Sequence, residues 1–229
     1  MRLDFYLSHV TDLARKAAKI AAAKGRVTVN GVEVKKANHT IVEGDQVCLD
    51  GELLAWPSEG YYLMHKPAGY VCANTDAEHP TVLDLLPSHL GQGLNIVGRL
   101  DKDTTGLLLL TTDGQWLHRI TSPRNACQKR YRMMLAEPIS DEALQALEEG
   151  VMLNGESQAT LPAKAQRLAE QEIYLTIQEG KYHQVKRMLA AVGNKVVSLH
   201  RDQIGELILD AQLQAGEFRE LTEQEVSYF

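Results

Sequence analysis

The chain has 229 residues, enough for one large domain or two small ones, and its 44% hydrophobic and 24% charged residues are typical of a folded protein rather than a disordered one. The longest aliphatic run is far below the roughly 18 residues of a membrane helix, and the first residues do not form a secretory signal, so we expect a cytoplasmic protein with no membrane span. The net charge of −6 argues at first against a nucleic-acid partner.

The charges are segregated along the chain. Residues 1–36 carry eight Lys or Arg against three acids, and residues 114–136 and 181–201 each carry five bases and no acid. Such segregation gives basic faces on an acidic body, and a basic face can bind a phosphate backbone. The competing interpretation is a scatter of solvated surface charges.

The cysteines and the motif content give no sign of a metal or a cofactor. Cys48, Cys72 and Cys127 are odd in number and lack metal-ligand spacing, so we expect reduced thiols without disulfide or zinc. There is no P-loop and no dinucleotide-binding fingerprint. We therefore expect a protein that works without a cofactor or metal.

A basic helix is expected near the amino terminus. Residues 13–24 are rich in Ala and Lys, Thr11 or Asp12 can cap the helix, and Gly25 can end it. Four of the basic side chains lie on this helix: Arg15, Lys16, Lys19 and Lys24.

A hairpin follows the helix. Asn30-Gly31 between two valine-rich runs is the strongest short hairpin signal, and a two-residue turn pairs Val29 with Val32. The valines then share one face, which can pack on the alanine face of the helix, and Arg26 and Lys35 would pair on the outer face. We expect a further turn and strand over residues 41–47 and a linker over residues 54–60.

The rest of the chain alternates short strands and helices. We expect strands over residues 61–65, 107–110, 129–133 and 172–178, and helices over 81–86, 114–122, 140–149 and 181–189. Asp113 is the expected cap of the second of these helices. On the last one Lys186 borders the apolar stripe, whereas Arg187 points away from it.

Residues 98–114 read GRLDKDTTGLLLLTTDG, a charged turn that leads into a four-leucine run. The run suits a strand buried on both faces, and its rigid entrance could hold a reactive carboxylate. A calcium loop starting at Asp101 is rejected, because the twelfth position, which should supply a glutamate, is Thr112. Ordinary turn chemistry is the alternative interpretation.

This stretch resembles the catalytic motif of the RsuA family of pseudouridine synthases. Three further motifs of that family occur in the expected order: HKPAG from His65, the K-x-Y element at Tyr131, and EGKYHQVKRM from Glu179. The resemblance implies that Asp101 is the catalytic residue, that Tyr131 lies against the target base, and that Lys186 pairs with Asp101. It implies scaffolding roles for the His and Gln of the last motif, and we assign Arg99 to phosphate contact or support of nucleotide flipping.

The amino-terminal helix and hairpin resemble the S4 RNA-binding module. The matching basic residues, expected to bind RNA, are Arg15, Lys16, Lys19, Lys24 and Arg26. The two resemblances together imply an α+β (mixed α/β) protein: an S4-like domain with linker over residues 1–58, then a synthase domain with largely antiparallel sheet over residues 59–229.

The implied function is conversion of one uridine, U516, of 16S ribosomal RNA to pseudouridine by a monomer, with a small-subunit assembly intermediate as the partner. Asp101 would act either as a nucleophile or as a base on the ribose. Two alternatives stay open: a synthase that modifies 23S RNA, and a non-catalytic RNA-binding assembly factor.

Overall fold

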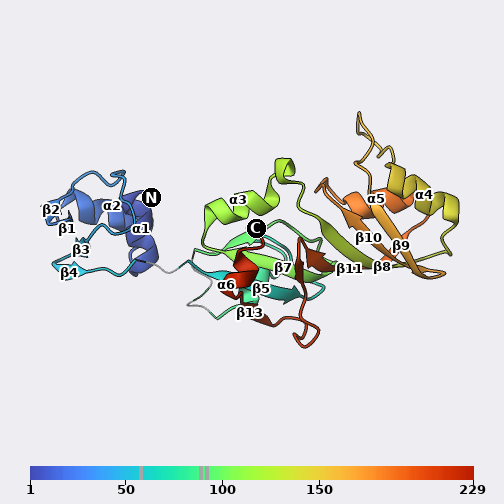
Figure 1. Ribbon diagram of the computed structural model, residues 1–229. Coiled ribbons are helices and arrows are strands. Elements are labelled where there is room, and N and C mark those ends of the chain that lie inside the picture. The colour runs from blue at the N-terminus through green and yellow to red at the C-terminus, as the bar shows by residue number, and fades with distance from the viewer. Residues whose placement is uncertain (57–58, 88–89, 91–92) are drawn as a thin grey trace. The chain divides into compact units, whose positions relative to one another are not determined.

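The computed structural model describes all residues except 57–58, 88–89 and 91–92. It divides into two compact units, residues 1–59 and 60–229 (Figure 1). The linker expected over residues 54–60 includes Pro57 and Ser58, which lie outside the described residues. In the described part of the chain, no helix has the length and apolar character needed to cross a membrane.

The smaller unit packs two helices on a four-stranded sheet of order β2-β1-β3-β4. Its elements are α1 (Leu3–Val10), α2 (Arg15–Ala23), β1 (Val27–Val29), β2 (Val32–Glu33), β3 (Val47–Leu49) and β4 (Glu52–Leu53). Three alanines of α2 share a buried cluster with Val27 and Val29, as the sequence predicts. Helix α1 was not predicted, although Leu3, Tyr6 and Leu7 have helical spacing and are buried.

The expected cap of α2 is wrong. The helix begins at Arg15 after Ala14, whose side chain cannot cap, and the Thr11 hydroxyl instead accepts a hydrogen bond from the Leu13 amide. Thr11 therefore shapes the turn between α1 and α2. The prediction failed because it did not include the first helix, which places the turn at this position.

The β1–β2 hairpin has the predicted turn. Asn30 and Gly31 have φ of 52° and 79°, and Val29 lies opposite Val32. These left-handed values are those of a type I′ turn, whose twist matches that of the strands. Val32 is 67% exposed, so the valine face is only partly buried.

The expected pairing of Arg26 with Lys35 is also wrong. Arg26 donates both ends of its guanidinium to Asp50, and Lys35 lies 3.1 Å from Glu33. Each cation forms an ion pair with a carboxylate, because two like charges side by side would repel each other.

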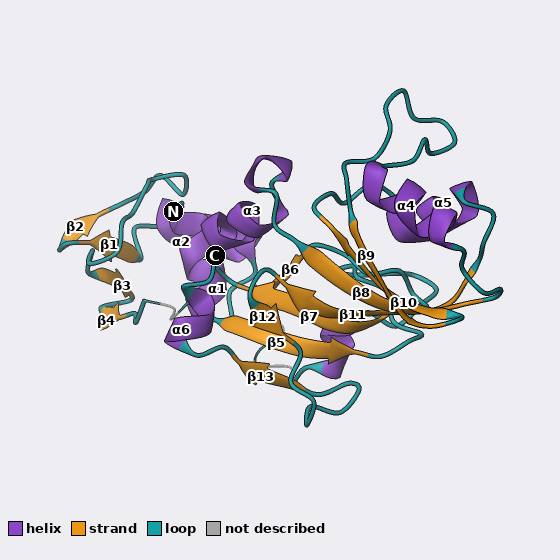
Figure 2. Ribbon diagram, turned by 45° about the vertical axis from the view of Figure 1, so that its right-hand side comes forward, coloured by secondary structure: helices purple, strands orange, loops and turns teal. Residues whose placement is uncertain are grey.

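The larger unit is built on a nine-stranded sheet (Figure 2). The order is β13-β5-β7-β11-β8-β10-β9, with β6 and β12 pairing with β7 and β11. The β7–β11 pair is parallel and the other pairs are antiparallel, which confirms an α+β fold with a largely antiparallel sheet. The strands are β5 (Tyr61–Lys66), β6 (Asn95–Val97), β7 (Thr105–Thr111), β8 (Lys129–Leu135), β9 (Lys164–Ala169), β10 (Glu172–Ile177), β11 (Val196–Ile204), β12 (Leu207–Ile208) and β13 (Phe218–Glu220).

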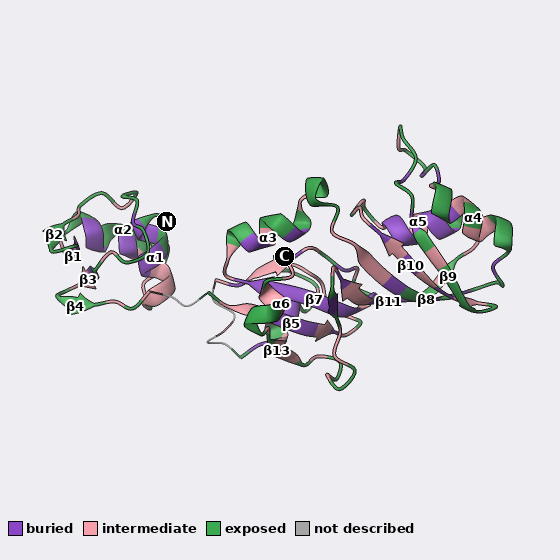
Figure 3. Cartoon of the chain, viewed as in Figure 1, coloured by how far each residue is buried: buried purple, intermediate pink, exposed green. Residues whose placement is uncertain are grey.

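Strand β7 carries the four-leucine run through the centre of the sheet. Leu107 and Leu109 pack in one cluster with Trp116, whereas Leu108 and Leu110 pack in a cluster on the other face. All four leucines are fully buried, which confirms a strand covered on both faces (Figure 3).

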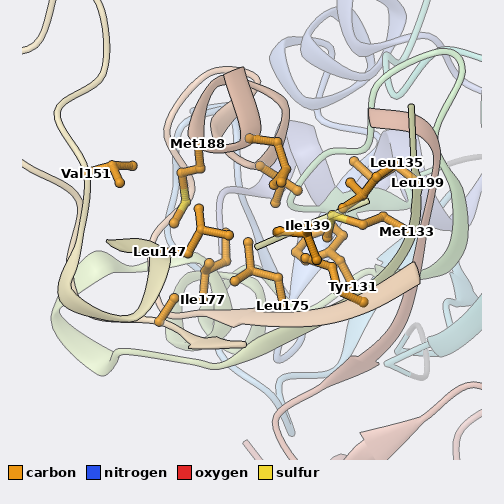
Figure 4. Packing of buried hydrophobic residues seen from close by; sticks show 14 of the residues in the cluster. Tyr131, Met133, Leu135, Ile139, Leu147, Val151, Leu175, Ile177, Met188 and Leu199 are labelled. Atoms are coloured by element: carbon orange, nitrogen blue, oxygen red, sulfur yellow. The ribbon is translucent and has the colours of Figure 1, made fainter. Parts of the chain in front are cut away.

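Helices cover the sheet on both sides. They are α3 (Gly114–Thr121), α4 (Asp141–Glu149), α5 (Gln184–Ala191) and α6 (Glu223–Val226), with short 3-10 turns η1 (Val82–Leu85) and η2 (Pro123–Asn125). Asp113 caps α3 as predicted, by accepting from two amides of the first turn. Leu147 of α4 and Met188 of α5 share a core with Leu175 and Ile177 of β10 (Figure 4).

Helix α5 starts at Gln184, three residues later than expected. The preceding residue, His183, has φ of 46°, in the left-handed region, so the backbone before Gln184 is not helical. This bend determines where the first side chains of α5 point.

Candidate active site

The site is built where the loop before β7 meets the start of α5. The Asp101 Oδ2 atom lies 2.9 Å from Lys186 Nζ, and the same ammonium lies 2.7 Å from Asp103 Oδ1. The side chains of Asp101 and Lys186 are each 27% exposed, whereas that of Asp103 is 73% exposed. The Asp101 carboxylate, which is partly exposed, is thus held against an equally exposed cation.

The cation is stable in this position. Burial opposes the charge of Lys186, but hydrogen bonds to Asp103 and Asp101 outweigh it and raise the pKa of the ammonium above its ordinary value. The hydrogen bond from Lys186 likewise lowers the pKa of Asp103. Lys186 therefore remains positively charged at physiological pH beside Asp101.

Arg187, the neighbour of Lys186, faces a different set of groups. Its guanidinium donates to Glu156 and to the carbonyl oxygens of Asn154 and Tyr182. Arg187 thus ties the segment before α5 to the loop at residues 154–156, while Lys186 contacts the two aspartates.

Lys66 forms side-chain hydrogen bonds to the backbone of the loop that carries Asp101. Its side chain is fully buried, and Nζ lies 2.8 Å from the Thr104 carbonyl oxygen, 3.0 Å from that of Pro67, 3.1 Å from that of Asp101 and 3.4 Å from that of Lys102. Burial lowers its pKa below the ordinary value. Sequence reasoning noted the motif around this lysine without giving the side chain a role. A lysine at the end of a buried strand was the available signal.

His183 also reaches the carboxylate, although the resemblance gave it only a scaffolding role. Its Nε2 atom lies 3.4 Å from Asp101 Oδ1, on the oxygen that Lys186 leaves free. Gln184, by contrast, is buried and bonds to Glu179 and to the Lys181 amide. It supports the bend before α5.

Tyr131 lies inside the core. It is 8% exposed, shares a cluster with Leu100, and its hydroxyl accepts from Arg201 Nη1 at 3.4 Å. Arg201 is 2% exposed and also donates to the Leu107 carbonyl. Its Nη2 atom is buried and has no hydrogen-bond partner among the described residues, which the sequence could not show. As positioned here, Tyr131 presents little of its ring to solvent.

The proposed RNA-contacting residues are all on the surface. The exposed ones are Arg15, Lys16, Lys19, Lys24, Arg26 and Arg99. Two of them share a buried partner, because Asp4, fully buried, lies 3.3 Å from Arg15 and 3.9 Å from Lys19. Burial would raise the pKa of Asp4, but hydrogen bonds from Arg2 and Arg15 lower it. The carboxylate therefore holds cations on α2 in place.

Metal-binding geometry is not seen in the described part of the chain: no three His, Cys, Asp or Glu side chains lie together there as ligands would. The groups around Asp101 are suited to chemistry by a carboxylate, with a fixed cation and a histidine beside it.

Comparison with known proteins gives one consistent result. The family described as RNA pseudouridylate synthase matches residues 60–191. A protein of Pasteurella multocida named ribosomal small subunit pseudouridine synthase A is 47% identical over 100% of this chain and 99% of its own length. Its namesake in Escherichia coli K12 is 45% identical over 99% of each chain. A crystal structure of a pseudouridylate synthase, 44% identical, covers 100% of this chain and 99% of its own with a TM-score of 0.74.

Proposed function

This chain belongs to the RNA pseudouridylate synthase family and is an isomerase that forms pseudouridine, and from that membership we propose that Asp101 is its catalytic residue and one uridine of 16S ribosomal RNA, U516, its target. The observation that carries the proposal is the 2.9 Å contact between Asp101 and Lys186 in a motif-bearing loop beside β7.

The choice of small-subunit RNA rests on the relatives. Proteins named ribosomal small subunit pseudouridine synthase A match this chain at 45–47% identity over at least 98% of their own length. A chain that aligns with them end to end carries the same set of domains, so the same class of RNA is the simplest proposal.

The reaction breaks the bond between ribose C1′ and uracil N1 and forms one between C1′ and C5. The C5 proton is lost to solvent and N1 gains one, so atoms balance without a redox partner. In its ionised form Asp101 can attack C1′ or remove a proton from the ribose. The Lys186 ammonium lies 2.9 Å from this carboxylate, and its charge favours the negative charge that develops on uracil as the C1′–N1 bond breaks.

Two buried residues support this chemistry by position. Lys66 restrains the backbone of the loop that bears Asp101, because it donates to the carbonyl oxygen of Asp101 itself and to that of Thr104. We assign Tyr131 to contact with the target base. Since it is 8% exposed in this structure, such contact requires local rearrangement when RNA binds.

The smaller unit is proposed to grip RNA as an S4-like module. Its contact residues would be Arg15, Lys16, Lys19, Lys24 and Arg26, and Arg99 of the larger unit would contact a phosphate near the flipped nucleotide. We propose that the protein acts as a monomer in the cytoplasm, on RNA within an assembling small subunit.

The test is pseudouridine formation in three forms of small-subunit RNA: naked, partly assembled, and in the complete subunit. Wild-type protein should give product without added cofactor, and Asp101→Asn should give none while it binds the RNA within about twofold of wild type. Lys186→Met should lower kcat by roughly 100-fold or more, because it removes a group that acts on the developing charge.

Asp103→Asn is the matched control, because Asp103 contacts the same ammonium from an exposed position. It should lower kcat by no more than about tenfold. Product in large-subunit RNA alone would disprove the substrate assignment. Equal turnover by wild type and Asp101→Asn would disprove the catalytic one, and binding without turnover on every RNA would favour an assembly factor.

A further inference from the structure

Tyr182 is the most exposed large apolar or aromatic side chain in the described part of the chain, at 74%. Its ring stacks on that of His183, with centroids 3.8 Å apart and planes inclined by 19°. One face of the tyrosine is therefore covered by imidazole, and the other face is open to solvent.

The stack lies beside the catalytic carboxylate. His183, its inner layer, approaches Asp101 at 3.4 Å through Nε2. The histidine therefore touches Asp101 through Nε2 and carries the tyrosine on one of its ring faces.

The segment that carries the stack is held rigidly. His183 has a φ of 46°, in the left-handed region, which is uncommon for residues other than glycine. Arg187 donates to the Tyr182 carbonyl at 3.1 Å, while Glu156 anchors the same guanidinium. These hydrogen bonds hold a segment whose aromatic ring is exposed and is not packed in the core.

A single exposed aromatic residue needs no explanation by itself. Here three features coincide: an open ring face, a flat stack on a histidine, and direct contact of that histidine with the active carboxylate. Core packing does not explain the position of the tyrosine, because its ring is exposed. A flat aromatic surface next to an RNA-modifying site is suited to a nucleobase, since every base has a π face.

We propose that the open face of Tyr182 binds the base of a nucleotide adjacent to the target uridine, so that base, Tyr182 and His183 form a three-layer stack whose histidine touches Asp101. This inference rests on the proposed function. The adjacent nucleotide is chosen because the open face of Tyr182 is the face away from His183, the residue that touches Asp101, whereas the target ribose must touch that carboxylate itself. Stacking would hold the neighbour in place while the target leaves its helix.

The experiment compares Tyr182→Ala and Tyr182→Phe with wild type on a small-subunit RNA fragment. Loss of one stacked base corresponds to roughly 5- to 150-fold in affinity. We expect Tyr182→Ala to raise both Kd and KM within that range with kcat changed less than about twofold, and Tyr182→Phe to stay near wild type. Ile208→Ala, which removes an exposed side chain from β12, is the control and should change neither constant.

A fluorescent base gives a direct readout. In RNA with 2-aminopurine next to the target uridine, on one side or the other, wild-type protein should quench one position and Tyr182→Ala should not. Unchanged thermal melting would show that the variant is folded. Equal Kd, KM and quenching for Tyr182→Ala and wild type would overturn the inference.

Failure of the proposed function would be recognised separately. If wild-type protein forms no pseudouridine in this RNA, the assignment of substrate fails. Affinity and quenching still decide whether Tyr182 receives a base, because neither readout requires turnover.

Discussion

Replacement of Lys66 by methionine tests whether the carbonyl cage around its ammonium stabilises the active-site loop. Methionine keeps most of the volume and removes the charge. In the wild type, Nζ contacts four carbonyl oxygens within 3.4 Å, and no carboxylate lies within salt-bridge distance among the described residues. The substitution therefore removes hydrogen bonds and a buried charge together.

The magnitude follows from the partners that remain. The Asp101 and Lys102 carbonyls also accept from the Thr104 and Gly69 amides, so the loss falls mainly on the Thr104 and Pro67 carbonyls. Each buried acceptor left unpaired costs about 1–3 kcal/mol of stability. Removal of the buried ammonium also removes its desolvation penalty, which offsets part of that cost. We expect the free energy of unfolding of the larger unit to fall by about 2 kcal/mol, and kcat to fall because Asp101 is less well held.

The assay uses the two tryptophans of the chain, one in each unit. In a Trp56→Phe background, fluorescence of the fully buried Trp116 reports unfolding of the larger unit alone. Lys66→Met should lower the urea midpoint by about 1 M. Lys164→Met, which removes an exposed lysine from β9, should stay within about 0.5 kcal/mol of wild type. An unchanged midpoint and kcat for Lys66→Met would refute the reasoning.

Two further predictions concern stability. Gly106→Ala should lower the free energy of unfolding by about 3 kcal/mol or more, because Gly106 has a φ of 109° and an added Cβ would lie 2.2 Å from the Arg201 carbonyl oxygen. Gly114→Ala, with open space around it, is the control and should be near neutral, so equal urea midpoints for the two variants would contradict the prediction. The hydrogen bond from Arg219 lowers the pKa of Glu225 to about 2, so this carboxylate stabilises the fold above about pH 4.5 and loses that contribution as the pH falls toward 2. Glu225→Gln should lower the free energy of unfolding by on the order of 2 kcal/mol at pH 7, allowing for partial exposure of the pair. The variant should also lose less stability than wild type between about pH 4.5 and 2. Urea unfolding at a series of pH values measures both effects, and parallel curves for the two proteins would contradict the prediction.

Local sequence patterns were sufficient to predict the features that depend only on residues close together in the chain. The four-leucine run predicted a strand buried on both faces, Asn30-Gly31 predicted the hairpin turn, and Asp113 predicted the start of α3. Each depends on periodicity or on backbone conformation within a few residues. The motif around Asp101 also indicated the family and the candidate carboxylate without the structure.

Partners distant in the chain were decided by tertiary structure. Asp103 and Lys186 are 83 residues apart, and Lys66 reaches the Thr104 carbonyl across 38 residues. Those contacts depend on the order of strands in the sheet, and local sequence does not encode strand order. The predicted partner of Arg26 was wrong for the same reason, because its actual partner, Asp50, lies in the turn between β3 and β4.

By itself, then, the sequence determined several of the strands and helices, their apolar faces and the family that the chain resembles, because periodicity and motif are local properties. Only the tertiary structure decided that His183 touches Asp101, that a buried lysine holds the loop and that Tyr182 is left exposed beside it. Burial and charge pairing depend on what the rest of the chain brings to each side chain, and that is known only when the sheet is assembled.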